Sequence, residues 1–368
     1  MLYLDYNATT PLKIEAQHAI QNLMGLPLNA SSIHQYGKTA KKIIKDTKQQ
    51  LKNVLNIQSE QIVFCSSGSE ANNLAIKGAN PEYIVVSAIE HLSVLKPARQ
   101  CKKHFVCPVD ENGVVDNISL EKILAEQGQG GLVCIMLANN ETGVLQKYDE
   151  IAQLCKKYKC LWFADAIQAF GKTNLDFSLL QADIITVSGH KIGASIGVAA
   201  VIFNDKKISL EPLIQGGNQE NKFRAGTENI LAIASFGAVL QKLSENIDFY
   251  QNQLKSYRNN FENKIKQIAP DAVIHSQDIG RIPNTSCITM PNVSSAVQLI
   301  AFDLAGIAVS TGSACSSGKV ESSHVLKAMK VDSKLADCTI RVSTGFDTKK
   351  EDLEKLFTAW RDLYKRTR

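Results

Sequence analysis

Lys191, Asp165 and Cys315 stand in surroundings that favour chemistry over packing. Lys191 follows the apolar run DIITVS in the segment SGHK, and Asp165 ends the apolar run LWFAD. Cys315 lies in STGSACSSG, where the neighbouring side chains are too small to bury a thiol as most packed cysteines are buried. If the apolar runs are parallel strands, Lys191 and Asp165 emerge at the edge of the sheet where ligands bind.

Asp165 allows three interpretations at such a strand end. An acidic residue there is commonly a helix cap or a metal ligand, but no cluster of His, Asp and Glu with metal-ligand spacing accompanies it. The third interpretation is a carboxylate that keeps a pyridine nitrogen protonated. Pyridoxal phosphate enzymes need such a carboxylate together with a lysine that bonds the cofactor, and Lys191 is the candidate for that lysine.

The segment SSGSEANN at residues 66–73 predicts a phosphate-binding turn. It follows the apolar run IVFC and precedes a helical pattern that opens at Ser69. Small residues let backbone N–H groups approach a phosphate, serine hydroxyls add donors, and a helix N-terminus favours negative charge. The two Gly-Lys-Thr triplets of the chain lack the first glycine of a Walker loop, which argues against nucleotide binding of that kind.

Short apolar, β-branched runs recur between amphipathic stretches and predict a mainly parallel sheet. Most of the runs are apolar on both faces, which is typical of strands covered by helices on both sides. Amphipathic segments such as residues 69–78 and 148–158 predict the helices between them. The runs occupy residues 62–64, 83–88, 104–109, 132–137, 160–166, 183–189 and 198–203.

The rest of the chain predicts a smaller α+β domain. A long helical region from about Thr227 through Ile268 separates it from the sheet. The runs VIHS, CITM, IAVST and TIRVSTG supply short strands, and residues 349–366 supply a closing helix. We therefore expect a large domain over residues 14–247, and a small C-terminal domain with the Cys315 loop over residues 1–13 and 248–368.

In its motifs, and in their order along the chain, the protein resembles the cysteine desulfurases of the NifS/IscS type. The similarity runs from YLDYNATTP at 3–11, through SSGSEANN, FADAIQ, SGHK and STGSAC, to IRVSTG at 340–345. These enzymes belong to class V of the pyridoxal-phosphate-dependent aminotransferase-like family. The resemblance implies the α/β architecture of fold type I, with a mainly parallel seven-stranded sheet in the large domain, and pyridoxal 5'-phosphate as the cofactor.

The resemblance also implies a role for each matching residue. Lys191 bonds the cofactor, Asp165 pairs with its ring nitrogen, and Gln168 bonds its ring hydroxyl. His91 of AIEHLSVL stacks on the ring and transfers protons. Arg341 of IRVSTG grips the substrate carboxylate, for which a planar two-pronged donor is suited. The other matches are the phosphate ligands Gly68, Ser69, Ser188 and His190, Asn140 of NNETG beside cofactor and substrate, and Thr227 of RAGT in the phosphate site of a neighbouring subunit. The role of Thr227 implies a homodimer.

The reaction that the resemblance implies ends on Cys315. Sulfur leaves L-cysteine, L-alanine is released, and Cys315 holds the sulfur as a persulfide for an acceptor protein, in iron–sulfur cluster assembly or another thiolation. A free thiol is only about a few per cent ionised near pH 7, and His91 is the candidate for its proton acceptor. Because the thiol must reach the substrate and then the acceptor, we expect residues 313–322 to be mobile when no substrate is bound.

Two departures from the family pattern keep alternatives open. After Lys191 the chain reads HKIGASIG, shorter than the usual HKIYGPKGIG, and it has GGNQE where the family has GGGQE or GGGHE. One alternative is a sister activity on the same scaffold, a selenocysteine lyase or a cysteine sulfinate desulfinase. The other is a degenerate homologue that only binds a partner protein, although the intact Lys191, Asp165, His91 and Cys315 count against it.

The composition argues against several other classes of protein. The chain has 368 residues, 44% hydrophobic and 21% charged, and its net charge of +5 is too small to indicate nucleic acid binding. The longest apolar runs are strand-sized, and Asp5 stands where a signal peptide has a basic region, so we expect no membrane association. Nine cysteines without a CxxC pair fit neither a disulfide framework nor a zinc knuckle, which predicts free thiols in the cytoplasm.

Overall fold

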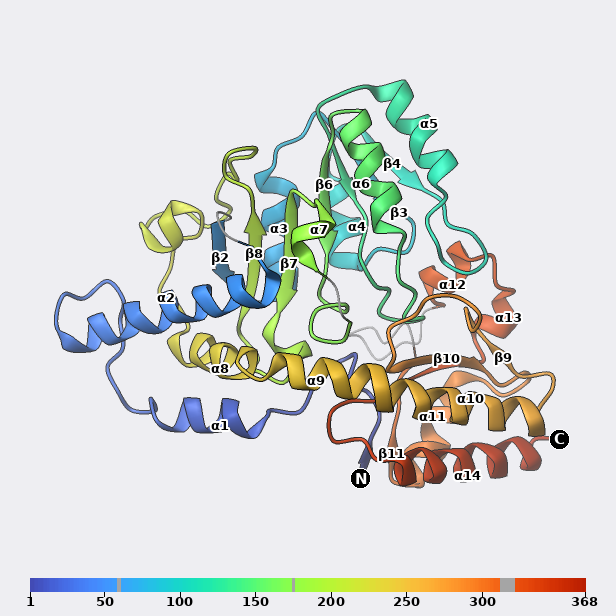
Figure 1. Cartoon of the computed structure of the whole chain (residues 1–368). Helices are drawn as coiled ribbons and strands as arrows, with labels where there is room; N and C mark the ends of the chain where they lie inside the picture. The colour runs from blue at the N-terminus through green and yellow to red at the C-terminus, as the bar shows by residue number, and fades with distance from the viewer. Residues whose placement is uncertain (58–60, 174–175, 312–321) are drawn as a thin grey trace.

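The computed structural model describes residues 1–57, 61–173, 176–311 and 322–368 and is built around a central sheet (Figure 1). The strands are β2 Gln61–Cys65, β3 Tyr83–Ser87, β4 His104–Cys107, β5 Gly131–Cys134, β6 Leu161–Asp165, β7 Ile184–Ser188 and β8 Ala199–Phe203. Within the described residues this sheet has seven strands, in the order β2-β8-β7-β6-β5-β3-β4. β8 runs antiparallel to β2 and β7, whereas the strands from β7 to β4 run parallel. The prediction of a mainly parallel seven-stranded sheet is confirmed.

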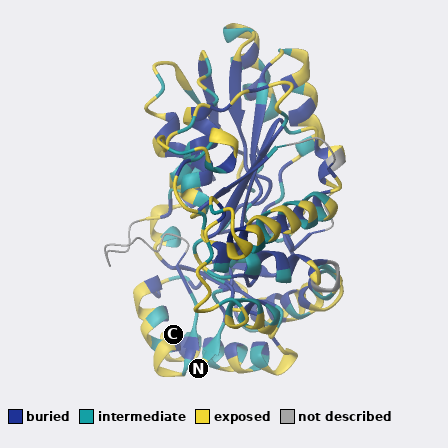
Figure 2. Ribbon diagram, turned by 90° about the vertical axis from the view of Figure 1, so that its left-hand side faces the viewer, coloured by how far each residue is buried: buried dark blue, intermediate teal, exposed yellow. Residues whose placement is uncertain are grey.

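Alternate residues of each strand pack on opposite faces of the sheet, as the pleat of a strand requires. Val133 and Trp162 belong to one core cluster, and their chain neighbours Leu132 and Phe163 belong to another. The first face is covered by α5 Asn117–Gln127 and α6 Tyr148–Lys157, and the second by α3 Gly68–Gly78 and α4 Leu92–Ala98. Figure 2 shows the buried strands between helices whose outer sides are exposed. The apolar runs of the sequence are therefore strands buried on both faces, except for the edge strand β4, in which His104 and Val106 are exposed.

Two strands end earlier than their apolar runs because the backbone hydrogen bonding changes. β4 ends at Cys107, since the following residue, Pro108, has no N–H to donate to a ladder. β5 ends at Cys134, although the Ile135 N–H still donates to the Phe163 carbonyl of β6 at 3.1 Å. The chain after β5 thus stays beside β6 while it leaves the sheet.

A second, smaller sheet lies beside the part of the molecule that contains the central sheet, at the lower right of Figure 1. Its elements are β9 Val273–Ile274, β10 Thr285–Thr289, β12 Thr339–Ser343, α10 Lys255–Ile268, α11 Ser295–Leu304 and α14 Lys350–Arg366. The three strands pair antiparallel in the order β12-β10-β9 within the described residues. A separate core cluster that contains Trp360, Phe302 and Leu4 lies against this sheet.

The N-terminus joins this smaller part of the molecule. β1 Leu2–Tyr3 pairs in parallel with β11 Ile307–Ala308, which places the start of the chain beside α14. The grouping of residues 1–13 with 248–368 in one domain, and the boundary near residue 248, stay predictions.

The predicted helical region between the two parts is divided. It contains α8 Ile230–Leu240, α9 Leu243–Phe249, a π-helical turn Tyr250–Leu254, and α10. α8 is buried on most of its surface, whereas α10 has the amphipathic pattern of a surface helix. The two helices therefore have different surroundings and do not continue as one straight helix. The other helices are α1 Ile14–Gln21, α2 Gln35–Leu55, α7 Phe177–Leu180, α12 His324–Ala328 and α13 Ser333–Ala336. Throughout the described ranges, no helix is both long enough and apolar enough to cross a membrane.

Candidate active site

The predicted site residues line one cavity of about 480 Å³ at the carboxyl ends of the central strands. Most of them lie at the end of a strand or shortly after it, which is where parallel α/β sheets bind ligands. Because neighbouring strands end at the same edge, loops that are distant in the sequence converge there. The predicted residues that line the cavity are Gly68, Ser69, His91, Asn140, Asp165, Gln168, Ser188, His190, Lys191 and Arg341.

One wall of the cavity offers donors to an anion. α3 begins at Gly68, after Ser67, whose Oγ accepts the Glu70 N–H at 3.2 Å. The first N–H groups of a helix have no partner within it, and the helix N-terminus favours negative charge. A Cβ atom on Gly68 would lie 2.6 Å from the Ile167 Cδ1 atom, so a larger residue there would displace the end of that side chain. The Ser188 hydroxyl is buried and has no hydrogen-bond partner among the described residues, which leaves it available to a ligand.

His190 adds a neutral ring to this wall. Its Nδ1 atom lies 3.1 Å from the Thr9 Oγ1 atom. Burial, together with the charge of Lys191, lowers the pKa of His190 to about 4. At neutral pH the imidazole is therefore uncharged and can donate a single N–H without adding positive charge.

Asp165 presents a buried carboxylate at the end of β6. Its Oδ1 atom accepts the Ile167 N–H at 2.9 Å, and its Oδ2 atom accepts the Asn72 amide at 2.8 Å. The Asn72 amide is oriented by the Thr186 hydroxyl, which donates to its Oδ1 atom at 2.7 Å. Burial nevertheless raises the pKa of Asp165, because the two hydrogen bonds offset only part of the cost of burying a charge. A cationic donor beside this carboxylate would remove that cost.

His91 faces the cavity from the start of α4. Its Nδ1 atom accepts the Ser93 N–H at 3.1 Å, so the proton of the neutral ring is on Nε2. Desolvation by the cavity walls lowers the pKa of His91, although the ring is open to the cavity. The ring is therefore mainly neutral near pH 7, with Nε2 able to donate a proton.

Lys191 follows β7 in a short 3-10 turn, Gly189–Lys191. Its Nζ atom donates to the carbonyl oxygens of Asn7 and Ala8 at 2.6 and 2.7 Å. Burial, and then the positive charge of Arg341, lower the pKa of Lys191 to about 8. Near neutral pH a sizeable fraction of the amine is thus free of its extra proton, which a nucleophile or a base requires.

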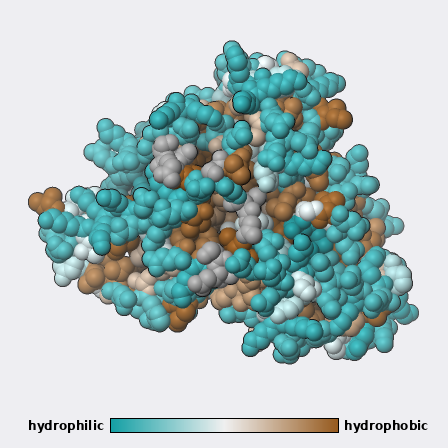
Figure 3. All heavy atoms as spheres, viewed as in Figure 1, coloured by the Kyte–Doolittle hydropathy of each residue, from teal (hydrophilic) through white to brown (hydrophobic). Residues whose placement is uncertain are grey.

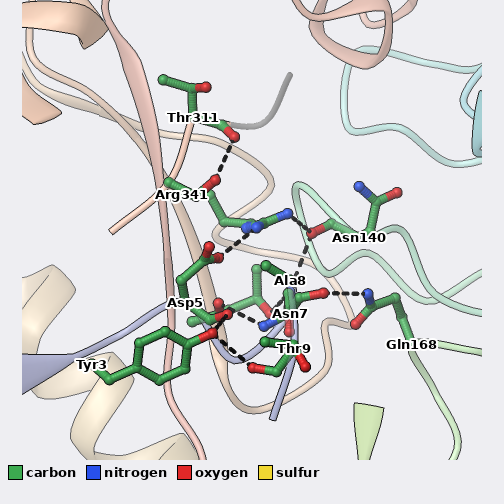
Figure 4. Close-up of polar contacts among 12 residues, drawn as sticks. Tyr3, Asp5, Asn7, Ala8, Thr9, Asn140, Gln168, Thr311 and Arg341 are labelled. Atoms are coloured by element: carbon green, nitrogen blue, oxygen red, sulfur yellow. Dashed lines mark hydrogen bonds and ion pairs between the residues drawn. The ribbon is translucent and has the colours of Figure 1, made fainter. Parts of the chain in front are cut away.

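Arg341 lies in β12, across the cavity from the central sheet. Figure 4 shows its guanidinium between Asp5 and Asn140, with an ion pair of 2.6 Å to Asp5 Oδ1 and a hydrogen bond of 3.1 Å to the Asn140 carbonyl. Its Nε atom is buried without a hydrogen-bond partner among the described residues. Arg341 therefore has an unused donor at a site that already neutralises part of its charge.

Comparison with known proteins identifies the family. Residues 2–356 match the family described as Aminotransferase class-V. The chain belongs to this family. Cysteine desulfurase IscS of Dictyoglomus turgidum is 35% identical over 363 residues, which cover 96% of this chain and 91% of the relative. Cysteine desulfurase 2 of Trichormus variabilis is 31% identical over 378 residues, which cover 100% of this chain and 94% of the relative. The X-ray structure of a NifS-like protein from Rickettsia africae is 38% identical, covers 99% of both chains and superposes with a TM-score of 0.93.

Class-V aminotransferases depend on pyridoxal phosphate, and the residues of the cavity fit that cofactor. The unpartnered Ser188 hydroxyl and the start of α3 fit its phosphate. The Asp165 carboxylate, whose charge is costly without a cation, fits a protonated ring nitrogen. The Lys191 amine, with its lowered pKa, fits the aldehyde that it would bond.

Two residues that the class-V resemblance singled out are not in the described cavity. Thr227 is exposed and does not line it. Cys315 lies outside the described residues, as do residues 313–321 of the segment whose mobility was predicted. Ser310 and Ser322, which flank that segment, both line the cavity. All eight described cysteines are free, and none of them lines it.

Several residues of this class-V site were missed by reasoning from the sequence. Asp5, Asn7, Glu141 and His324 also line the cavity. Asp5 and Asn7 belong to the quoted motif YLDYNATTP, and Glu141 to NNETG, so the motifs contained a signal for them. Their tasks depend on partners far away in the chain, such as the ion pair that joins Asp5 to Arg341. No local pattern shows such a contact.

Proposed function

We propose that this chain is a cysteine desulfurase, which converts L-cysteine to L-alanine with pyridoxal phosphate and passes the sulfur to Cys315. The observation that carries the proposal is the meeting of Lys191, Asp165 and Arg341 around one cavity. They supply an amine with a lowered pKa, a buried carboxylate and an unsatisfied guanidinium donor. The amine and the carboxylate serve the cofactor, and the guanidinium serves the carboxylate of an amino-acid substrate.

The residues would hold the cofactor at three points. The start of α3, with Gly68 and Ser69, and the side chains of Ser188 and His190 take the phosphate. Asp165 holds a proton on the ring nitrogen, and His91 stacks against the ring face. When bound, pyridoxal phosphate supplies an electron sink for the pair of electrons left on the substrate Cα atom.

The residues would then orient the substrate and move its protons. Arg341 binds the carboxylate of L-cysteine through the donors that Asp5 leaves free, and Asn140 lies beside it. The neutral Lys191 Nζ atom takes the proton from Cα, for which its pKa of about 8 is suited because a base works best with a pKa near the ambient pH. His91 Nε2 can return a proton during the formation of alanine.

In the sulfur transfer, the thiol of Cys315 accepts the sulfur atom of the substrate. Its sulfur forms an S–S bond with the substrate sulfur while the substrate C–S bond breaks. The electron pair of the C–S bond goes to the Cβ atom, which gains a proton and becomes the methyl group of alanine. The products are L-alanine and a persulfide on Cys315. The cavity positions of Ser310 and Ser322 support this assignment, since the chain reaches and leaves the cavity on either side of Cys315.

A homodimer with shared sites is part of the proposal. Thr227 is exposed, which is compatible with a contact to the phosphate site of a second copy. Large apolar side chains, among them Met24 at 66%, Ile33 at 87% and Ile196 at 76% exposure, lie outside the core. Figure 3 shows apolar patches at the lower left, in the region where Figure 1 places α1. Burial of such patches against a second copy would stabilise a dimer.

The fate of the sulfur and the location of the protein are also proposals. The acceptor is a sulfur-carrier or iron–sulfur scaffold protein, because a persulfide must be passed on for the enzyme to turn over. The cytoplasm is the expected location, supported by the eight described cysteines, all of which are free.

The absorbance spectrum after addition of pyridoxal phosphate distinguishes an active desulfurase from a degenerate homologue that only binds a partner protein. The purified protein should develop the visible band of a covalently held cofactor, and Lys191→Ala should not. A wild-type protein that shows no such change would favour the non-catalytic alternative. Rates with L-cysteine, L-selenocysteine and L-cysteine sulfinate then separate the sister activities, since only the desulfurase reaction requires Cys315.

A further inference from the structure

Lys172 is a buried lysine that none of the motifs above explains. It lies at the end of the turn after β6 and is 1% exposed. Its Nζ atom donates to Gln168 Oε1 at 2.7 Å and to Asn7 Oδ1 at 2.9 Å. Within the described ranges no carboxylate forms an ion pair with it, and burial together with Lys191 and Arg341 lowers its pKa far below the usual value. A buried amine without a counter-ion is costly, so the contacts that it makes call for an explanation.

The bond from Lys172 helps to set which way the Gln168 amide faces. Lys172 donates one N–H to Asn7 Oδ1 and another to Gln168 Oε1, so the amide oxygen faces the lysine. The amide nitrogen points away from it. The Nε2 atom donates one N–H to the Asn7 carbonyl at 3.0 Å (Figure 4). No described residue accepts the second N–H, and Gln168 lines the cavity.

Asn7, the other acceptor of Lys172, is held in place by more contacts. Its Oδ1 atom also accepts from Asn284 at 3.2 Å, and its Nδ2 atom donates to Thr285 Oγ1 at 2.8 Å. Removing Lys172 therefore leaves Asn7 oriented. Gln168 has no second described donor to its Oε1 atom, so its orientation depends on Lys172 and on the Asn7 carbonyl that accepts from Nε2.

We propose that Lys172 is a positioning residue that fixes the Gln168 amide with its free N–H toward the ring hydroxyl of the cofactor. The proposal rests on the proposed function, since it concerns the contact of Gln168 with pyridoxal phosphate. With the amide so held, the ring oxygen receives a hydrogen bond, which favours its ionised form. Without Lys172 only the Asn7 carbonyl opposes a turn of the amide, and in the molecules that turn, the amide oxygen faces the ring oxygen, which is repulsive.

The test is a double-mutant cycle read by absorbance and by cofactor affinity. Lys172→Met removes the donor but keeps an apolar chain of similar length, and Gln168→Leu removes the amide. Each variant should lose part of the visible band at fixed pH, in favour of the near-ultraviolet band of a protonated ring oxygen. Each should also bind the cofactor about fivefold more weakly, which is the change in affinity expected for the loss of one typical hydrogen bond. The double variant should add nothing to the single ones, because both act through the same contact.

Lys13→Met is the matched control. Lys13 is also a buried lysine, at 6% exposure, but it does not line the cavity and lies over the Phe346 ring. Its replacement should leave the band unchanged. If Lys172 only supports the fold, Lys172→Met will lower the melting temperature and leave the band and the affinity as in the wild type, and the proposal is overturned.

Two further results complete the test. If Lys172→Met does not fold, Lys172→Gln replaces it, since a glutamine can both donate and accept and so frees the Gln168 amide to turn over. It should then show an intermediate loss of the band, and a wild-type band would overturn the proposal. A wild-type protein that forms no band overturns the proposed function and this inference with it, whereas a normal wild-type band with an unaffected Lys172 variant overturns the inference alone.

Discussion

The amine of Lys191 lies among groups that disfavour its positive charge. Burial and Arg341 lower its pKa to about 8, while Asp5 and Asp165 offset only part of that effect. Two backbone carbonyls hold the Nζ atom in place without adding negative charge. The position of the amine and its readiness to lose a proton thus have separate causes.

The pH dependence of cofactor capture follows from this pKa. Only the neutral amine attacks an aldehyde, so in the cofactor-free protein the rate of capture should rise with pH up to about 8 and then level off. An ordinary lysine would keep the rate rising to about pH 10. Stopped-flow absorbance after mixing with pyridoxal phosphate measures this rate. A continued rise through pH 9.5, roughly, would show that the site does not lower the pKa.

Arg341 should matter for substrate binding through its shape as well as its charge. Arg341→Lys keeps one positive charge but loses the planar fork, so the KM for L-cysteine should rise about tenfold or more, as expected for the loss of a charged hydrogen bond. Steady-state release of alanine measures the change. Arg258→Lys is the control, because Arg258 is also buried but donates to the Ile282 carbonyl away from the cavity. An equal rise in both variants would point to a general loss of structure.

At this scale the sequence predicts the residues that stand at strand ends and not the ones that orient them. Asp165 and Lys191 follow apolar runs, so their place at one sheet edge is a consequence of the strands. Asn7 and Lys172 are joined by a hydrogen bond across 165 positions of the chain. Such a contact is created only by the folded arrangement, and a local pattern does not contain it.

The loop between Lys191 and β8 is short and contains the segment HKIGASIG. Gly193 has φ +93°, and its carbonyl accepts the Lys13 N–H at 2.9 Å. A Cβ atom there would lie 2.6 Å from Lys13 Cγ. The short loop is therefore a tight connection that ties α1 to the lysine of the site.

Gly193→Ala should destabilise the protein by about 1 to 2 kcal/mol from its left-handed backbone alone, with the contact to Lys13 adding to this. Gly280→Ala is the control, because a Cβ atom on Gly280 meets nothing within 4 Å and its φ is not positive. Thermal unfolding compares the two variants. A melting temperature as low for Gly280→Ala as for Gly193→Ala would contradict this account of the loop.

Among the elements, the strands were predictable and the division of the helices was not. A strand buried on both faces needs an unbroken apolar run, and such runs are visible in a sequence. α8 and α10 are both helical by pattern, and what separates them is that one is enclosed by its neighbours while the other covers the smaller sheet. Burial of this kind depends on the tertiary arrangement.

At the scale of the whole molecule, the proposed homodimer with shared sites makes a testable prediction. If Thr227 completes the phosphate site of the partner, Thr227→Ala and Lys191→Ala should damage different halves of that site. Co-expression of the two variants should restore up to about a quarter of the wild-type activity, since half of the dimers are mixed and each mixed dimer has one intact site. Mixed dimers that form, as seen by tags of two kinds, but stay inactive would place Thr227 outside the shared site.

The central claim is that sulfur leaves L-cysteine and is held on Cys315. The most direct measurement is alanine release from L-cysteine by the protein loaded with pyridoxal phosphate, with Cys315→Ser and Lys191→Ala beside the wild type and mass spectrometry of the reacted chain. We expect steady release by the wild type, one added sulfur atom on the peptide that contains Cys315, and background release by both variants. Release by Cys315→Ser at the wild-type rate, or none by the wild type, would contradict it.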